Sequence, residues 1–137
     1  MQDTTPFPIQ NRQAGFAIDG QHTEVFISGF LDKIFVIVTQ YGKIGSLIQT
    51  TLDVAPHQAA NPNAVPTTSH FLSGESNGAQ SDLYVLYATS ISQAIAAMNP
   101  NEKRPVLLGI ALKTVEDNKR KDVFHAIMDK IMDNRVW

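Results

Sequence analysis

The 137-residue chain contains no cysteine. Without a thiol, the protein cannot form a disulfide scaffold, a cysteine nucleophile, a zinc–cysteine site or an iron–sulfur cluster. Positive charge is not in excess either, because 11 lysines and arginines stand against 13 aspartates and glutamates. The chain therefore lacks the basic surface that is typical of proteins binding nucleic acid or anionic membranes, and we expect neither partner.

Long apolar runs are also missing. The longest, residues 34–38, is far too short to span a bilayer, and the first residues lack the basic-then-apolar order of a secretory signal. We therefore expect a cytoplasmic protein that is also compatible with the nucleus. With 43% hydrophobic and 18% charged residues, the composition predicts one globular domain over residues 1–137. Its prolines and alanines predict a flexible loop at about 53–66.

The hydrophobic pattern predicts five to six strands and two main helices. Strands are expected at 15–18 (beginning as early as residue 10), 23–28, 33–40, 46–51, 67–72 and 105–112, and helices at 81–98 and in the segment after residue 114. Residues 41–43 are expected to turn the chain so that strand 46–51 returns from strand 33–40. Most strands precede the helices. The order favours an α+β fold, with an antiparallel sheet and both helices on one face.

Two of the expected strands are apolar at successive positions, so that both of their faces are hydrophobic. Two helices can cover only one face of the sheet. The other face must be covered by the sheet folding over itself or by a second protein, and we expect a dimer partner. The side chains expected in this sheet–sheet layer are Phe35, Ile37, Val106, Leu108 and Ile110. The opposite parity stays open, because the sequence does not say which face the helices cover.

Catalytic or ligand-binding motifs are scarce. No two of the four histidines have metal-ligand spacing, and the glycine-rich segment 42–46 departs from the phosphate-binding loop because its lysine precedes the second glycine. We expect no catalytic residue, cofactor or metal. The turn at 40–45 is the best surface candidate for recognition, with Thr39 and Gln40 leading into it, Tyr41 offering contact area and Lys43 a charge. A turn kept for folding alone is the alternative.

Residues 36–47 read VIVTQYGKIGSL. This segment resembles the proteasome assembly chaperone 3 family, in which a strand ends in Val-Thr-Gln-aromatic-Gly-Lys-apolar-Gly-Ser/Thr-Leu. Residues 23–25 resemble the preceding strand of that family, residues 106–113 its late strand, and the terminal Val-Trp its chain end. The stretch 53–66 is longer and richer in proline and alanine than in the animal members.

The resemblance implies a non-enzymatic chaperone that promotes assembly of the 20S proteasome α-ring without ATP or metal. Family members pair through their sheets with a related fourth proteasome assembly chaperone and also form homodimers. They bind proteasome α-type subunits, notably alpha type-5. These properties agree with a two-faced apolar sheet that carries no catalytic group.

Two other classes of function are compatible with the residues alone. The first is a generic dimeric scaffold or interaction module of another complex, which binding assays against α-type subunits would distinguish. The second is a small-molecule-binding or catalytic domain, which requires a buried polar cluster around His22 or His70.

Overall fold

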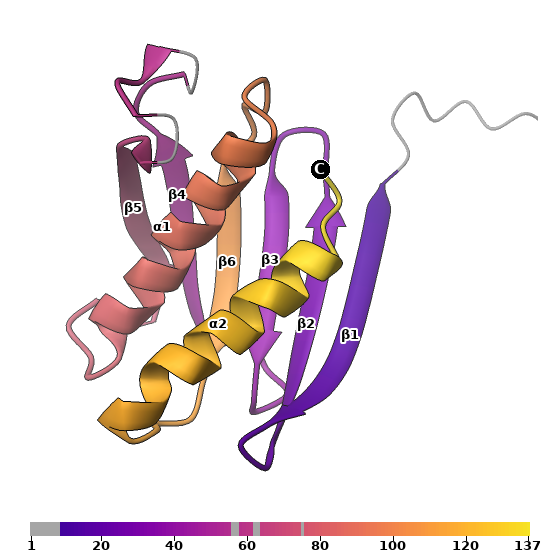
Figure 1. The fold of residues 1–137 in the computed structure, drawn as a ribbon, viewed down its shortest axis with the longest axis vertical. Coiled ribbons are helices and arrows are strands. Elements are labelled where there is room, and N and C mark those ends of the chain that lie inside the picture. Colours follow the sequence, from indigo (N-terminus) through magenta and orange to yellow (C-terminus); the bar gives the residue numbers. More distant parts are fainter. Residues whose placement is uncertain (1–8, 56–57, 62–63, 75) are drawn as a thin grey trace, which may run out of the picture.

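The computed structural model describes residues 9–55, 58–61, 64–74 and 76–137. The elements in chain order are β1 (Gln10–Ile18), β2 (Gln21–Gly29), β3 (Ile34–Thr39), β4 (Ser46–Leu52), β5 (Thr67–Ser73), α1 (Ser81–Met98), β6 (Val106–Ala111) and α2 (Asp117–Asp133). The six strands form one sheet in the order β1-β2-β3-β6-β4-β5. Both helices lie across the same face of this sheet (Figure 1). The predicted α+β fold is confirmed, and so is the placement of both helices on one face.

The sheet is mixed rather than fully antiparallel. β3 and β6 run parallel, whereas the other neighbouring pairs are antiparallel. The expected return of β4 beside β3 is wrong, because β6 lies between them and pairs with both. A strand that is apolar at nearly every position is typical of the interior of a sheet, and β6 takes that place, with a neighbouring strand along each edge.

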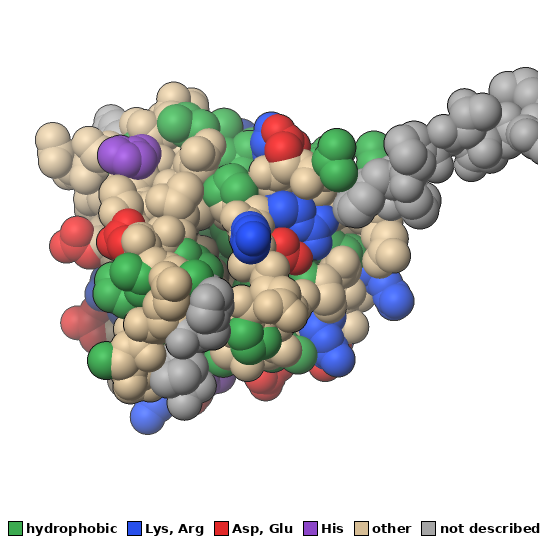
Figure 2. Space-filling view, turned by 90° about the horizontal axis from the view of Figure 1, so that it is seen from above, with side chains coloured by type: hydrophobic (Ala, Val, Ile, Leu, Met, Phe, Trp, Pro, Cys, Tyr) green, Lys and Arg blue, Asp and Glu red, His purple; other side chains and the backbone are tan. Residues whose placement is uncertain are grey.

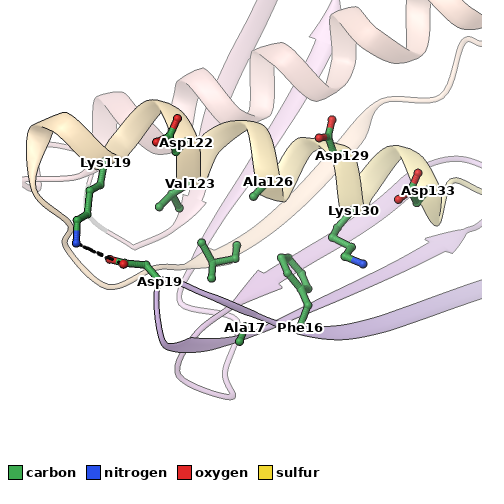
Figure 3. Close-up of a pocket in the computed structure, with 11 residues that line it drawn as sticks. Phe16, Ala17, Asp19, Lys119, Asp122, Val123, Ala126, Asp129, Lys130 and Asp133 are labelled. Carbon is green, nitrogen blue, oxygen red and sulfur yellow. Dashed lines mark hydrogen bonds and ion pairs between the residues drawn. The ribbon is translucent and has the colours of Figure 1, made fainter.

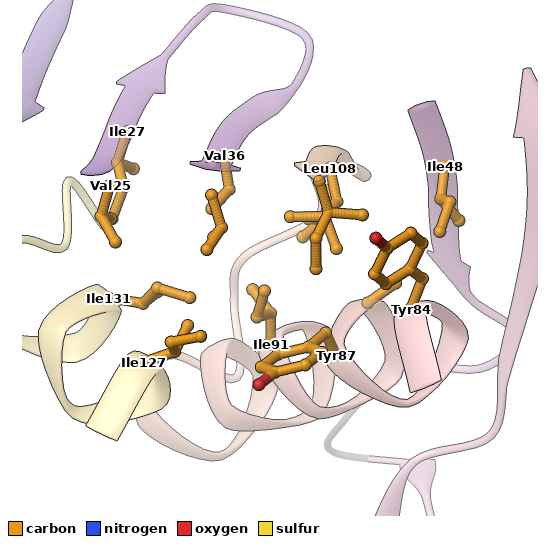
Figure 4. Close-up of a cluster of buried hydrophobic side chains, with 14 of the residues drawn as sticks. Val25, Ile27, Val36, Ile48, Tyr84, Tyr87, Ile91, Leu108, Ile127 and Ile131 are labelled. Atoms are coloured by element: carbon orange, nitrogen blue, oxygen red, sulfur yellow. The ribbon is translucent and has the colours of Figure 1, made fainter. Parts of the chain in front are cut away.

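The hydrophobic core lies between the sheet and the helices (Figure 4). Alternate residues of the central strands point toward α1 and α2, as the two-residue period of a strand requires. The fully buried core side chains include Val25, Ile27, Val36, Val38, Ile48 and Leu108 from the strands, and Tyr87, Ile91, Ile127 and Ile131 from the helices. Burial, with a smaller contribution from the neighbouring Tyr84, raises the pKa of the Tyr87 phenol, which therefore stays neutral.

Tyr84 fastens α1 to the end of β6. Its hydroxyl accepts a hydrogen bond from the backbone N–H of Leu112 at 3.0 Å and donates to the carbonyl of the same residue at 3.3 Å. Gln80 Nε2 also donates to that carbonyl, at 2.7 Å. Leu112 follows the last residue of β6, and its buried backbone N–H bonds to the Tyr84 hydroxyl instead of to a neighbouring strand.

Two further contacts secure the end of the molecule where α1 ends and β6 begins. Arg104 pairs with Glu102 at 2.6 Å and donates to the carbonyl of Phe30 at 2.9 Å, which ties the α1–β6 loop to the β2–β3 hairpin. The side-chain hydrogen bond from Arg104 lowers the pKa of Glu102. The chain end packs back beside this hairpin, with Val136 against Gly29, and Trp137 contacts the core.

The predicted loop at 53–66 is described in part. Pro56, His57, Pro62 and Asn63 lie outside the described residues. Within the described part, Val65 is buried, and its carbonyl accepts a hydrogen bond from Gln93 of α1 at 3.1 Å. The end of this loop nearest β5 is therefore anchored to the helix layer.

Candidate functional site: the open face of the sheet

The sheet face that α1 and α2 leave uncovered is mainly apolar at its centre. The strand register places Phe26, Ile37, Gly109 and Leu47 in one row that crosses β2, β3, β6 and β4. In the next row, Phe35 and Leu107 lie side by side. We call the face formed by Phe26, Phe35, Ile37, Ile44, Leu47 and Leu107 the open face.

Most side chains of the open face are partly buried by one another rather than by another layer. Phe26, Phe35, Ile37, Leu47 and Leu107 are half-buried, whereas their neighbours on the helix side are fully buried. A contiguous apolar surface of this kind is a candidate interaction site.

Ile44 extends this surface beyond the end of β3. Its Cγ2 would lie 2.6 Å from a Cβ placed on Gly109, so the glycine in β6 leaves the space that Ile44 occupies. Ile44 remains 42% exposed. The segment that leaves β3 thus folds over the sheet and adds an apolar side chain to the open face.

The turn at 40–45 is held in shape by the residues that precede it. Thr39 is buried, and its Oγ1 accepts hydrogen bonds from the backbone N–H groups of Tyr41 and Lys43 at 3.1 and 3.2 Å. Gln40 bridges two segments, because it donates to Thr23 Oγ1 and accepts from the N–H of Lys113. Thr39 and Gln40 therefore position the turn.

Tyr41 and Lys43 are the exposed members of this turn. Tyr41 is 55% exposed, and two ammonium groups lie above its ring, those of Lys43 at 5.9 Å and Lys113 at 5.6 Å from the ring centre. An aromatic ring with two cations near it presents a positively charged, aromatic contact.

Three of the predicted partner-binding residues lie on the opposite face. Val106, Leu108 and Ile110 point toward the helices and are buried, so the prediction that grouped them with Phe35 and Ile37 assigned the wrong face of β6. Parallel register explains the error. Phe35 pairs with Leu107, which puts the odd-numbered residues of both strands on one face.

Phe26, Ile44, Leu47 and Leu107 were not predicted. Phe26 lies between Val25 and Ile27 in β2 and so faces the opposite side of the strand, but the sequence does not show which side the helices cover. The sequence signal for Ile44 was Gly109 of β6, because Ile44 packs against that glycine.

The arrangement offers little for chemistry. His22 and His70 are exposed, so the buried polar cluster required by a catalytic domain is not formed around either. Among the described residues, no three potential metal-ligating side chains gather. No helix in the described part of the chain is long and apolar enough to cross a membrane. At the end of the molecule seen in Figure 2, described charges of both signs are intermixed and form no continuous basic patch.

Comparison with known proteins gives the family of the chain. The family model of Proteasome assembly chaperone 3 matches residues 36–134. The chain belongs to this family. The match begins in β3 and runs through the turn, β6 and α2, so it includes most of the open face.

A curated relative and a solved structure add to this assignment. Proteasome assembly chaperone 3 of Nematostella vectensis is 35% identical over 106 residues, which cover 74% of each chain. The fold is similar to that of a chain in a crystal structure described as a novel chaperone complex for yeast 20S proteasome assembly, with a TM-score of 0.57. That match covers 90% of this chain and 98% of the other at 11% identity, and it therefore supports the fold alone.

Proposed function

We propose that this protein is a non-enzymatic chaperone that promotes assembly of the 20S proteasome α-ring. It works as a dimer with a related fourth proteasome assembly chaperone and binds α-type subunits, notably alpha type-5. Binding energy alone drives the process, by holding correct neighbours together and disfavouring wrong ones. Its place of action is the cytoplasm, and also the nucleus.

The single observation that carries the proposal is the open face in a member of a proteasome assembly chaperone family. Helices cover one side of the sheet, and the other side keeps a continuous apolar surface across β2, β3, β6 and β4. Two such faces can pack about 10 Å apart with interdigitated side chains. The related chaperone is the proposed occupant, and a second copy of this chain is the occupant in the homodimer.

The turn at 40–45 is the proposed contact with an α-type subunit near the edge of the dimer. Its charge and aromatic ring suit a moderate, partly polar contact, which a chaperone that must later leave requires. Lys43→Glu reverses the charge at an exposed position and leaves the Thr39 hydrogen bonds to the backbone intact. The recognition role is wrong if this variant binds α-type subunits as the wild type does while the dimer is maintained.

The test of the proposed function is capture of α-type subunits by the chaperone pair. The chain is purified with the fourth chaperone and offered each α-type subunit separately, and every eluted complex is analysed by size-exclusion chromatography with light scattering. We expect a 1:1 chaperone pair that selectively captures alpha type-5. A folded pair that binds no α-type subunit would refute the proposal and favour a scaffold of another complex.

A further inference from the structure

A second surface lies on the opposite side of the sheet, between β1 and α2. The groove has a volume of about 610 Å³ and runs along the outermost strand (Figure 3). Its apolar floor is formed by Phe16, Ile18, Val123 and Ala126. The groove is separate from the open face, because Phe16 and Ile18 point toward the helix layer.

The outer edge of β1 pairs with no other described strand. An edge strand presents a row of backbone N–H and C=O groups that can pair with an added extended segment. Since the groove borders this edge, a segment added to β1 would place alternate side chains over the apolar floor.

Three residues with carboxylates line the helix rim of the groove, and Figure 3 shows the carboxylates of Asp122 and Asp129 on the side of α2 away from β1. Asp122, Asp129 and Asp133 are exposed, and none makes an ion pair or hydrogen bond within the described part of the chain. At about 100° per residue they fall within roughly 40° of one another around α2, and so form one stripe. We call these three residues the acidic wall.

The two lysines of the groove do not neutralise this wall. Lys119 pairs with Asp19 at 3.2 Å, and the ammonium group of Lys130 lies 5.3 Å from the ring centre of Phe16. Figure 3 shows Lys119 directed to Asp19, and Lys130 and Phe16 directed toward one another across the groove. Among the residues that the structure describes, the acidic wall therefore has no counterion.

We propose that this groove binds an extended segment bearing lysine or arginine and apolar side chains, supplied by the proteasome subunit that the chaperone assembles. The inference rests on the proposed function for the source of the segment. The acidic wall spans about 16 Å along the helix, which an extended chain covers in about five residues. Because the side chains of an extended segment alternate in direction, basic residues four and then two positions apart would point to the same side and match the spacing of the three carboxylates to within the reach of a lysine side chain.

The charge of the groove disfavours two other occupants. The first eight residues of this chain contain one aspartate and no lysine or arginine, so they do not complement the acidic wall. A second copy paired edge to edge through β1 would bring its own α2 beside this one, with the two acidic walls facing each other. Like charges in such a symmetric contact repel.

The first arm of the test uses a synthetic peptide, acetyl-Lys-Thr-Val-Thr-Lys-Thr-Lys-amide, whose three lysines and valine share one face when it is extended, with the full-length isotope-labelled protein. We expect amide shifts in β1 and α2 by NMR, and no such shifts with the peptide in which glutamate replaces each lysine. Equal binding of both peptides, or shifts of the basic peptide confined to the open face, would overturn the proposal.

Variants then test the acidic wall. D122N, D129N and D133N combined should weaken peptide binding about tenfold, since three exposed ion pairs of modest strength are lost. D32N, D82N and D117N combined remove the same charge outside the groove and should leave binding within twofold. A126R, which fills the groove at a half-buried position, should also abolish binding. Retention of full affinity in the first triple variant or in A126R would refute the groove.

The second arm repeats the capture of α-type subunits with the same variants in the chaperone pair. We expect the acidic-wall variant to lose subunit binding about tenfold while the pair stays intact, and the matched control to retain it. Subunit capture unaffected by the acidic-wall variant overturns the groove as a client site. Peptide binding in the groove without any subunit capture by the wild type overturns the proposed function instead.

Discussion

Replacing Ile37 by aspartate should separate the folding of this chain from its association with a partner chaperone. Ile37 lies in the central row of the open face, between Phe26 on β2 and Gly109 on β6. It is half-buried, so the new carboxylate can reach water in the isolated chain. We expect the free energy of unfolding to fall by only about 1 kcal/mol.

The same carboxylate becomes buried when a second apolar sheet packs on the open face. The row that contains Ile37 holds no lysine or arginine to pair with it. An unpaired charge in such a layer costs about 3 kcal/mol or more, which is roughly a 150-fold increase in Kd. Leu86→Asp is the matched control, because Leu86 is 51% exposed on the helix side of the sheet.

The assay is titration of the fourth chaperone against each variant, with light scattering to report the size of the complex and circular dichroism to report the fold. We expect Ile37→Asp to remain folded and monomeric, and Leu86→Asp to associate as the wild type does. A folded Ile37→Asp protein that pairs with unchanged Kd would refute the assignment of the open face to the partner.

Three further predictions concern the fold that supports this surface. Tyr84→Phe should lower the unfolding free energy by about 2 kcal/mol in urea titration, because a buried N–H at the end of β6 loses its acceptor. Tyr87→Phe should cost about 0.5 kcal/mol or less. Equal costs for the two variants would contradict the account. Glu102→Gln should destabilise by about 2 kcal/mol at neutral pH. The folded-state pKa of Glu102 is lowered, so the difference in stability between wild type and variant is complete above the ordinary glutamate pKa. This difference should vanish as the pH falls through the lower folded-state pKa. A stability difference that persists in acid would contradict the prediction. Gly45→Ala should lower the unfolding free energy by about 2 kcal/mol or more, since the φ of Gly45 is +70° and a Cβ would lie 2.6 Å from a carbonyl oxygen. Gly42→Ala should lower it by about 1 kcal/mol, because Gly42 has a φ of +72° but open space around it. Thermal or urea unfolding measures both.

The sequence predicted elements better than their arrangement. The 3.6-residue pattern predicted α1 with the bounds that the structure shows, and the apolar runs located β3 and β6 to within one residue at each end. These are local signals. The position of β6 between β3 and β4 depends on long-range pairing, which no local pattern specifies.

The open face was predicted in part for the same reason. The argument that one sheet face lacks a helix layer follows from the number of elements, and Phe35 and Ile37 were placed on that face. The residues of β6 were assigned to the wrong face, because a strand that is apolar throughout carries no parity signal. The β1–α2 groove could not be predicted, since it depends on the angle at which α2 crosses an edge strand.

The most direct test of the central claim is reconstitution of the α-ring. The α-type subunits are mixed in equal amounts at a concentration where unassisted assembly is poor, with or without the chaperone pair and without nucleotide. The ring products are identified by native mass spectrometry. We predict that the pair raises the yield of rings containing each subunit once, that Ile37→Asp abolishes the gain, and that Leu86→Asp retains it. An unchanged yield and composition of rings with a folded pair present would contradict the account.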